Sequence, residues 1–381
     1  MKTNNYLSKI IKYINIKTIS SIILILFVIA SIASITGNNK AKNNEPEVIS
    51  GFYFDTFIKI SIYDDITSEH KKRILNLLLT YDTIFSPTNK DSLTTKVNAN
   101  QTNYVNIDYA KTLSDALEIA TDTNGAVDPS IIGVYELYDF SPDNKINPSE
   151  DDILSKLAFV DYTSISLDGI TVHKPDETKI GFGYIAKGYI AEAIKDELLT
   201  MGYHNATIDL GGNILFLGDK NGQFYTTAIV DPFYDRLDDI FYADYEYSNE
   251  FKDFSDSYNP NLICSIDNIR ANEMALASMK VSDVSVVTSG IYERYYIDQN
   301  GKIMHHILDP ETGYPVDNEL VSVTIIGPNS EICDAYSTAC FVMGTEKAID
   351  YLSEKADYSG MFITKCEDVI FTEDFPYEVT K

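Results

Sequence analysis

Residues 305–316 read HHILDPETGYPV, and this stretch is more informative about the chain than any other. Two adjacent histidines lead into an Asp-Pro step and a Thr-Gly-Tyr-Pro turn, a combination that packing alone rarely requires. The segment VTSGIYER precedes it at 287–294, and CDAYSTA follows it at 333–339. Together they indicate strand, polar loop, strand and then a helix that carries a carboxylate and hydroxyls. This order is typical of a site for a phosphate-rich ligand and a metal ion.

The N-terminus predicts export or membrane attachment. Residues 1–17 hold lysines and no acidic residue, residues 18–39 hold no charge, and residues 19–35 are almost wholly apolar. A basic segment before such a run is typical of a signal peptide or a single membrane anchor. We therefore assign residues 1–37 to a signal peptide or membrane anchor, 38–50 to a linker and 51–381 to one domain. We expect this domain to lie outside the cytoplasm, membrane-anchored or secreted.

The composition excludes some partners. With a net charge of −27, the surface should bind neither nucleic acid nor an anionic membrane nonspecifically. A phosphorylated substrate would also be repelled unless a cation or a helix N-terminus compensates locally. The four cysteines have no CxxC spacing, and we interpret them as small apolar residues, with one disulfide left open: Cys264, Cys333, Cys340 and Cys366.

Hydrophobic periodicity indicates an α+β fold with mixed sheets and packed helices. Alternation predicts strands at 56–63 and 321–326, and two short strands within 207–217. Helical spacing predicts helices at 68–80, 109–120 and 183–199, and one or two helices over 334–352. These elements do not alternate strictly as βα units, which argues against a doubly wound sheet.

Two glycine-bearing segments could approach a ligand with their backbone. Residues 181–189, GFGYIAKGY, resemble a phosphate-binding loop that enters a helix, although the spacing matches neither a Walker nor a Rossmann motif. Residues 208–213, IDLGGN, end a predicted strand with two glycines that permit close backbone approach. For each segment the alternative is a tight turn that needs glycine.

Asp334 and Thr338 are four positions apart and share one face of the predicted helix. A carboxylate and a hydroxyl, together with backbone carbonyls, suit Mg²⁺, which also binds substrate phosphates. The alternative is that Asp334 caps the helix N-terminus. His305 and His306 lack the spacing of zinc ligands. In a strand only one of them should enter the site, where it would contact phosphate or move a proton.

In their order along the chain, these segments resemble the ApbE family, the FAD:protein FMN transferases. The resemblance covers residues 51–351 and rests on eight motifs: Phe54 to Thr56, Phe85 to Asn98, Gly125 to Pro129, Ala186 to Tyr189, Asp209 to Asn213, Thr288 to Glu293, His306 to Pro315 and Asp334 to Thr338. It implies that residues 51–381 are the catalytic domain of an extracytoplasmic enzyme. Such an enzyme uses Mg²⁺ and FAD to transfer FMN to a Thr or Ser hydroxyl of a target protein, releasing AMP. The target would belong to a redox or electron-transfer system.

The resemblance also implies roles for particular residues. His306 and Asp334 would be catalytic, and the metal would be held by the side chains of Asp334 and Thr338 and the carbonyl of Ala186. The residues expected to contact FAD are Phe54, Thr88, Ala126, Val127, Asp128, Lys187 and Leu308.

Three features depart from the family pattern. Gly181 stands where many members have Asp, so one flavin contact is not implied there. Thr88 stands where an aromatic residue is frequent, so stacking on the flavin is not implied there. Residues 231–256, with nine acidic residues and eight Phe or Tyr, form a longer excursion than the family leads us to expect. We interpret it as a surface segment packed by its own rings, with disorder as the alternative.

Other functions fit parts of the same pattern. A metal-dependent FAD pyrophosphatase would need the same pyrophosphate site, with water in place of the target hydroxyl. A surface flavin-binding protein without turnover would have no need of Asp334, Thr338 and His306 together. A purely structural anchored protein would need none of these motifs.

Overall fold

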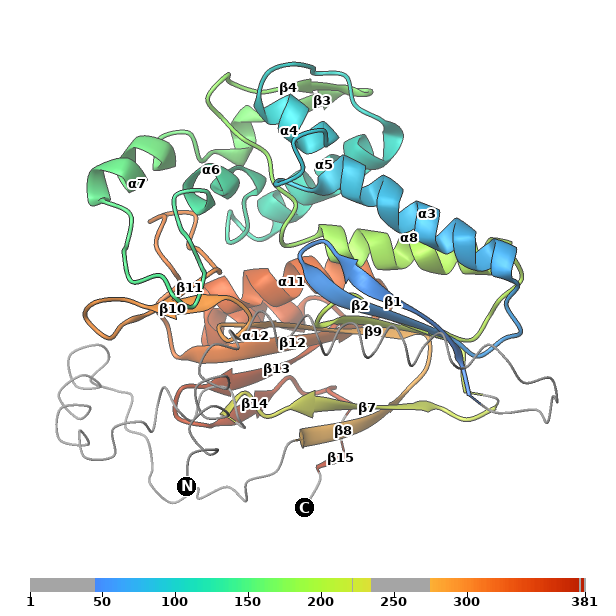
Figure 1. The fold of residues 1–381 in the computed structure, drawn as a ribbon. Coiled ribbons are helices and arrows are strands. Elements are labelled where there is room, and N and C mark those ends of the chain that lie inside the picture. Colours follow the sequence, from blue (N-terminus) through green and yellow to red (C-terminus); the bar gives the residue numbers. More distant parts are fainter. Residues whose placement is uncertain (1–44, 221, 234–274, 377, 380–381) are drawn as a thin grey trace, which may run out of the picture. The chain divides into compact units, whose positions relative to one another are not determined.

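An eight-stranded sheet forms the centre of the described chain, which comprises residues 45–220, 222–233, 275–376 and 378–379 of the computed structural model (Figure 1). Its strands lie in the order β1 (Glu47–Tyr53), β2 (Thr56–Ile62), β5 (Ala206–Asp209), β6 (Asn213–Leu217), β9 (Val284–Gly290), β12 (Leu320–Gly327), β13 (Ser359–Thr364) and β14 (Val369–Phe371). Every pairing in this sheet is antiparallel. The α+β class is confirmed. The expectation of mixed sheets is wrong for the described strands, because each runs antiparallel to its neighbours.

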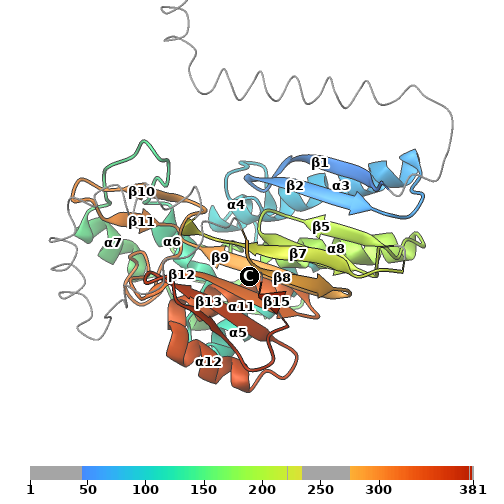
Figure 2. The ribbon, with the colours of Figure 1, turned by 90° about the horizontal axis from the view of Figure 1, so that it is seen from below.

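Within the described ranges, three small sheets accompany the large one. The first contains three strands in the order β15 (Glu378–Val379), β8 (Ala275–Val281) and β7 (Tyr225–Val230). The second pairs β10 (Tyr295–Ile297) with β11 (Ile303–His305), and the third pairs β3 (Ser166–Asp168) with β4 (Thr171–His173). Figures 1 and 2 show β7 and β8 on the side of the large sheet opposite to α8 (Ala186–Thr200) and α11 (Ser330–Met343). With layers on both sides, all eight residues of β12 are buried.

The helices follow the predicted periodicity, with ends set by capping residues. α3 (Ser68–Phe85) begins after Thr67, whose side chain accepts a backbone N–H. α5 (Ile107–Asp122) is followed, after its C-cap Thr123, by Asn124 and Gly125, both with positive φ, which stop the helix. Residues 334–352 belong to two helices, α11 and α12 (Thr345–Ser353), because Gly344 has φ 79° between them. The other helices of the described residues are α4 (Leu93–Asn98), α6 (Ile132–Tyr135), α7 (Glu150–Leu157) and the short 3₁₀ helices η1 (Pro129–Ile131) and η2 (Tyr162–Ser164).

The domain begins earlier than the sequence indicates. β1 starts at Glu47, inside the predicted linker, because residues 47–53 pair along their whole length with β2. The predicted N-terminal hydrophobic segment, and residues 234–256 of the predicted excursion, lie outside the described residues. In the part of the chain that the structure describes, no helix combines the length and the apolar character needed to cross a membrane.

The cysteines differ in state. Cys333 and Cys340 are free and buried in α11, as expected for small apolar residues. Cys366 is bonded in a disulfide, so for this residue the alternative left open, one disulfide, applies in place of the apolar interpretation.

Candidate active site

The N-terminal turns of α8 and α11 are in close contact. Gly188 makes this contact possible, because a Cβ at this position would lie 2.3 Å from the carbonyl oxygen of Ser330. Asn329 caps α11, its side chain accepting the backbone N–H of Ile332. The alternative in which Asp334 caps the helix is therefore wrong. Asp334 lies one turn further on and faces α8.

Asp334 is a buried carboxylate with its donors on α8. Only 3% of the residue is exposed. Its Oδ2 accepts the backbone N–H of Gly188 at 3.0 Å, and its Oδ1 lies 4.0 Å from the ammonium of Lys187. Burial raises the pKa of Asp334, while Lys187, the N–H of Gly188 and the amide of Asn213 act in the opposite direction. The carboxyl group of Asp334 has therefore lost most of its water, and the nearest cation the structure gives it is the ammonium of Lys187, 4.0 Å away.

Lys187 also contacts the turn between β5 and β6. Its ammonium donates to the carbonyl of Gly211 at 3.4 Å. Gly211 and Gly212 have φ of 71° and 85°, so the tight-turn interpretation of these glycines is confirmed. Contact of this turn with a ligand stays a prediction. The ammonium of Lys187 thus connects the motif at 186–188, to which it belongs, with the motif at 208–213, to which it donates.

Thr338 lies one helical turn after Asp334 and is partly exposed. Its hydroxyl lies 3.2 Å from the hydroxyl of Ser289 at the end of β9, and Ser289 lies 2.7 Å from Ser337. Within the described residues, no cluster of three or more His, Cys, Asp or Glu could hold a metal ion. A cation here would therefore have one carboxylate, from Asp334, and otherwise neutral oxygens such as the Thr338 hydroxyl and the Ala186 carbonyl. This donor set fits a hard cation such as Mg²⁺ that shares its coordination with substrate phosphates.

His305 and His306 occupy different environments, as expected for neighbours at a strand end. His305 is buried: its Nε2 donates to the carbonyl of Val316 at 3.0 Å, and its Nδ1 accepts the N–H of Ile307 at 3.3 Å. Both ring nitrogens are thus used by the backbone, and burial lowers the pKa of His305 to about 4. His305 is a structural residue.

His306 is partly exposed, and only one of its two ring nitrogens is hydrogen-bonded to the backbone. Its Nδ1 donates to the carbonyl of Arg294 at 3.3 Å, which leaves Nε2 with a lone pair. Burial lowers the pKa of His306, and the charges of His305, Arg294 and Lys187 lower it further. The imidazole is therefore neutral at physiological pH and can accept a proton.

The residues expected to contact FAD lie in several places. Phe54 is at the β1–β2 turn with φ 52°, a conformation rare for an aromatic residue and often found at functional sites. Thr88 is exposed beside the hydroxyl of Ser86 at 3.2 Å, Ala126 is partly buried, and Val127 and Leu308 are buried. A role for these residues in binding FAD stays a prediction.

Asp128 has a local structural role. Its Oδ1 accepts the N–H of Ser130 at 2.7 Å and the hydroxyl of Ser130 at 2.5 Å, and its Oδ2 accepts the N–H of Tyr162 at 3.0 Å. The carboxylate therefore caps η1 and ties it to η2. Contact of Asp128 with FAD stays a prediction.

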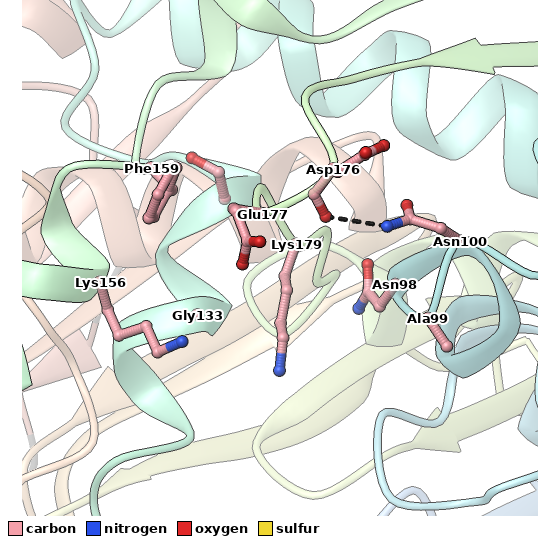
Figure 3. A pocket seen from close by; sticks show the side chains of 10 residues that line it. Asn98, Ala99, Asn100, Gly133, Lys156, Phe159, Asp176, Glu177 and Lys179 are labelled. Carbon is pink, nitrogen blue, oxygen red and sulfur yellow. Dashed lines mark hydrogen bonds between the residues drawn. The ribbon is translucent and has the colours of Figure 1, made fainter.

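A separate cavity of about 250 Å³ lies among α4, α6 and α7 (Figure 3). Lys156 and Lys179 line it together with Asp176 and Glu177, so its charge is mixed. None of the predicted site residues lines this cavity. It is therefore not the predicted pyrophosphate site.

Three functional candidates were not predicted as site residues. Gly188, Asn213 and Ser289 lie inside the motifs at 181–189, 208–213 and 287–294. The signal for Gly188 was its position directly after Lys187 at the start of a helix. The contacts of Asn213 and Ser289 depend on tertiary packing, and no local pattern in the sequence could reveal them.

Comparison with known proteins gives one consistent result. Residues 54–249 and 257–362 match the ApbE family. The FAD:protein FMN transferase of Klebsiella pneumoniae is 33% identical over 229 residues, 59% of each chain. That of Treponema pallidum is 32% identical over 260 residues, 66% of this chain and 64% of the relative. The matched part thus spans less than two thirds of these two relatives.

Solved structures agree. The ApbE protein of Thermotoga maritima matches with a TM-score of 0.70 and 25% identity, over 86% of this chain and 97% of that one. The flavin transferase ApbE from Vibrio cholerae matches with a TM-score of 0.69 and 22% identity, over 87% and 98%. The second likeness concerns the fold alone. The chain belongs to the ApbE family.

Proposed function

We propose that this protein transfers FMN from FAD to a Thr or Ser hydroxyl of an extracytoplasmic target protein, with Mg²⁺, and releases AMP. The relatives named FAD:protein FMN transferase support this activity. The observation that carries the proposal is the meeting of Lys187, Gly188 and Asp334 at the α8–α11 contact. An ammonium, a helix N-terminus and a cation-binding carboxylate are what a pyrophosphate requires.

The reaction balances as a phosphoryl transfer. The acceptor hydroxyl oxygen forms a bond to the phosphorus on the FMN side of the pyrophosphate, and the bond from that phosphorus to the oxygen of AMP breaks. The hydroxyl proton goes to a base, and AMP leaves with the bridging oxygen. A bound Mg²⁺ would supply charge neutralisation on the phosphate oxygens.

The chain's own residues supply the other roles. Lys187 places a positive charge beside the phosphates, and Nε2 of His306 accepts the hydroxyl proton, because Nδ1 is held by the carbonyl of Arg294 and the lone pair of Nε2 is available. Asp334, with the Thr338 hydroxyl and the Ala186 carbonyl, would hold the cation. Residues 1–37 would place this site outside the cytoplasm by acting as an export signal or a membrane anchor.

The test is to incubate the full chain with FAD, Mg²⁺ and a candidate acceptor, followed by mass spectrometry of the acceptor. We expect one FMN phosphoryl adduct on a Thr or Ser and one AMP per adduct. Release of FMN and AMP without any adduct, for every acceptor offered, would favour the FAD pyrophosphatase instead. FAD binding without AMP release would indicate a flavin-binding protein.

A further inference from the structure

Four oxygen atoms link the end of β9 to α11 in a continuous chain. The hydroxyl of Ser337 donates to the backbone carbonyl of Asp334 at 2.9 Å. The hydroxyl of Ser289 lies 2.7 Å from that of Ser337 and 3.2 Å from that of Thr338. The three hydroxyls are therefore linked in a row, from Thr338 through Ser289 to Ser337, and the row ends on the carbonyl of Asp334.

Only one arrangement of the three protons satisfies all three contacts. A carbonyl can only accept, so the proton of Ser337 points at Asp334. Ser337 must then accept from Ser289, and Ser289 must accept from Thr338. The proton of Thr338 is thus directed at Ser289, and the lone pairs of its oxygen face away from β9.

Thr338 lacks a hydrogen bond that several threonines near the end of α3 and in or next to α5 make. In α5, the hydroxyls of Thr112 and Thr121 each donate to the carbonyl four residues earlier, and the hydroxyl of the C-cap residue Thr123 does the same. For Thr338 that carbonyl is the one of Asp334, which Ser337 occupies. The Thr338 hydroxyl is therefore held off its own backbone by Ser289.

We infer that Ser289 is a positioning residue that orients the Thr338 hydroxyl so that its oxygen presents lone pairs to a cation. This rests on the proposed function, which makes Thr338 a ligand of Mg²⁺. A metal ligand must offer a lone pair, and partners behind the ligand determine which side it offers. Ser337 anchors the chain through the carbonyl of Asp334, the residue that supplies the carboxylate.

The test compares two substitutions of similar shape at one position. Ser289→Thr keeps the hydroxyl, whereas Ser289→Val replaces it with a methyl group. We expect calorimetry with MgCl₂ and the full chain to show near-normal affinity for Ser289→Thr. Affinity should fall about 10-fold or more for Ser289→Val. The metal-free melting temperatures of the two variants should be similar, which a merely structural role would not predict.

A double-mutant cycle shows whether Ser289 acts through Thr338. In a Thr338→Val background, Ser289→Val should cost no further Mg²⁺ affinity. Equal Mg²⁺ affinity of Ser289→Thr and Ser289→Val, or an undiminished loss in the Thr338→Val background, would overturn the inference. If Ser289→Val lowers the metal-free melting temperature, Ser337→Ala gives an independent test. Ser337→Ala should weaken Mg²⁺ binding. An unchanged Mg²⁺ affinity of this variant would overturn the inference.

The outcome also separates this inference from the proposed function. A wild-type chain that transfers FMN and binds Mg²⁺, with Ser289→Val unaffected, would overturn only the role of Ser289. A wild-type chain that binds no Mg²⁺ in the presence or absence of FAD would overturn the metal site, and the role of Ser289 with it.

Discussion

Gly188 and Asp334 are joined across two helices, the backbone N–H of the first donating to Oδ2 of the second at 3.0 Å. The same glycine, by lacking a Cβ, lets the two helices approach at Ser330. Ala186 and Lys187 immediately precede it in the first turn of α8. One backbone segment thus supplies the hydrogen bond, the close contact and the ammonium that surround the carboxylate.

Asp334→Asn should abolish Mg²⁺-dependent turnover with little change in folding. The amide keeps an oxygen that can accept from Gly188 but carries no charge for a cation. We expect Mg²⁺ affinity to fall by about 10–100-fold or more. Calorimetry and a turnover assay at limiting Mg²⁺ would measure this.

Asp334→Ala is the matched comparison, because it also leaves the N–H of Gly188 without its acceptor. It should lose metal binding to the same extent and be less stable than Asp334→Asn by about 1–3 kcal/mol. Unchanged turnover of either variant at limiting Mg²⁺ would refute the assignment of Asp334 to the metal.

Gly188→Ala should separate α8 from α11. Its Cβ would lie 2.3 Å from the carbonyl oxygen of Ser330, which is backbone and cannot rotate away. We expect a loss of about 1–3 kcal/mol in the free energy of unfolding, together with loss of turnover. Gly183→Ala is the control, because a Cβ there meets nothing within 4 Å. Similar effects of the two substitutions would argue against the packing explanation.

Local patterns in the sequence predict the helices and strands better than they predict the contacts between them. Strand β2 and helix α5 follow from alternation and from an Asn-Gly stop, because both signals are local. The predicted helix over 334–352 starts too late: Asn329 is the N-cap, and α11 begins at Ser330, four residues before Asp334. With that start unknown, Asp334 could be interpreted as a cap.

The antiparallel pairing and the role of Ser289 depend on which strands become neighbours. Ser289 reaches α11 because β9 lies between β6 and β12, beneath that helix. Nothing in the spacing of the motif at 287–294 specifies that arrangement. The sequence left one disulfide open, but which cysteine takes part in it also depends on the fold, and the structure shows that Cys366 does.

His306→Ala should lower turnover by about 10²–10⁴-fold with a modest loss of FAD affinity. The reason is that Nε2 of His306 keeps a lone pair while Nδ1 is held by the carbonyl of Arg294. His306→Asn is a useful companion, because its amide nitrogen takes the place of Nδ1 and can still donate to that carbonyl but cannot act as a base. If both variants transfer FMN at the wild-type rate, the base lies elsewhere, and Asp334 is the next candidate.

His305 should make the protein sensitive to mild acid. Its folded-state pKa is lowered to about 4, below the value of about 6.5 for an unfolded histidine. Between these values the unfolded chain binds the proton and the folded chain does not, so stability is complete above about pH 6.5 and falls as the pH drops. The loss should approach about 1.4 kcal/mol per pH unit for this residue.

Urea unfolding of the wild type and of His305→Gln between pH 7 and pH 5 would measure this effect. The glutamine amide can replace the donor to the carbonyl of Val316 but takes up no proton on unfolding. The variant should therefore be less stable than the wild type at pH 7, and the difference should shrink toward pH 5. His306 titrates in the same direction, but it is present in both proteins and cancels in the comparison. Parallel pH profiles of the two proteins would show that His305 is not the buried neutral histidine described here.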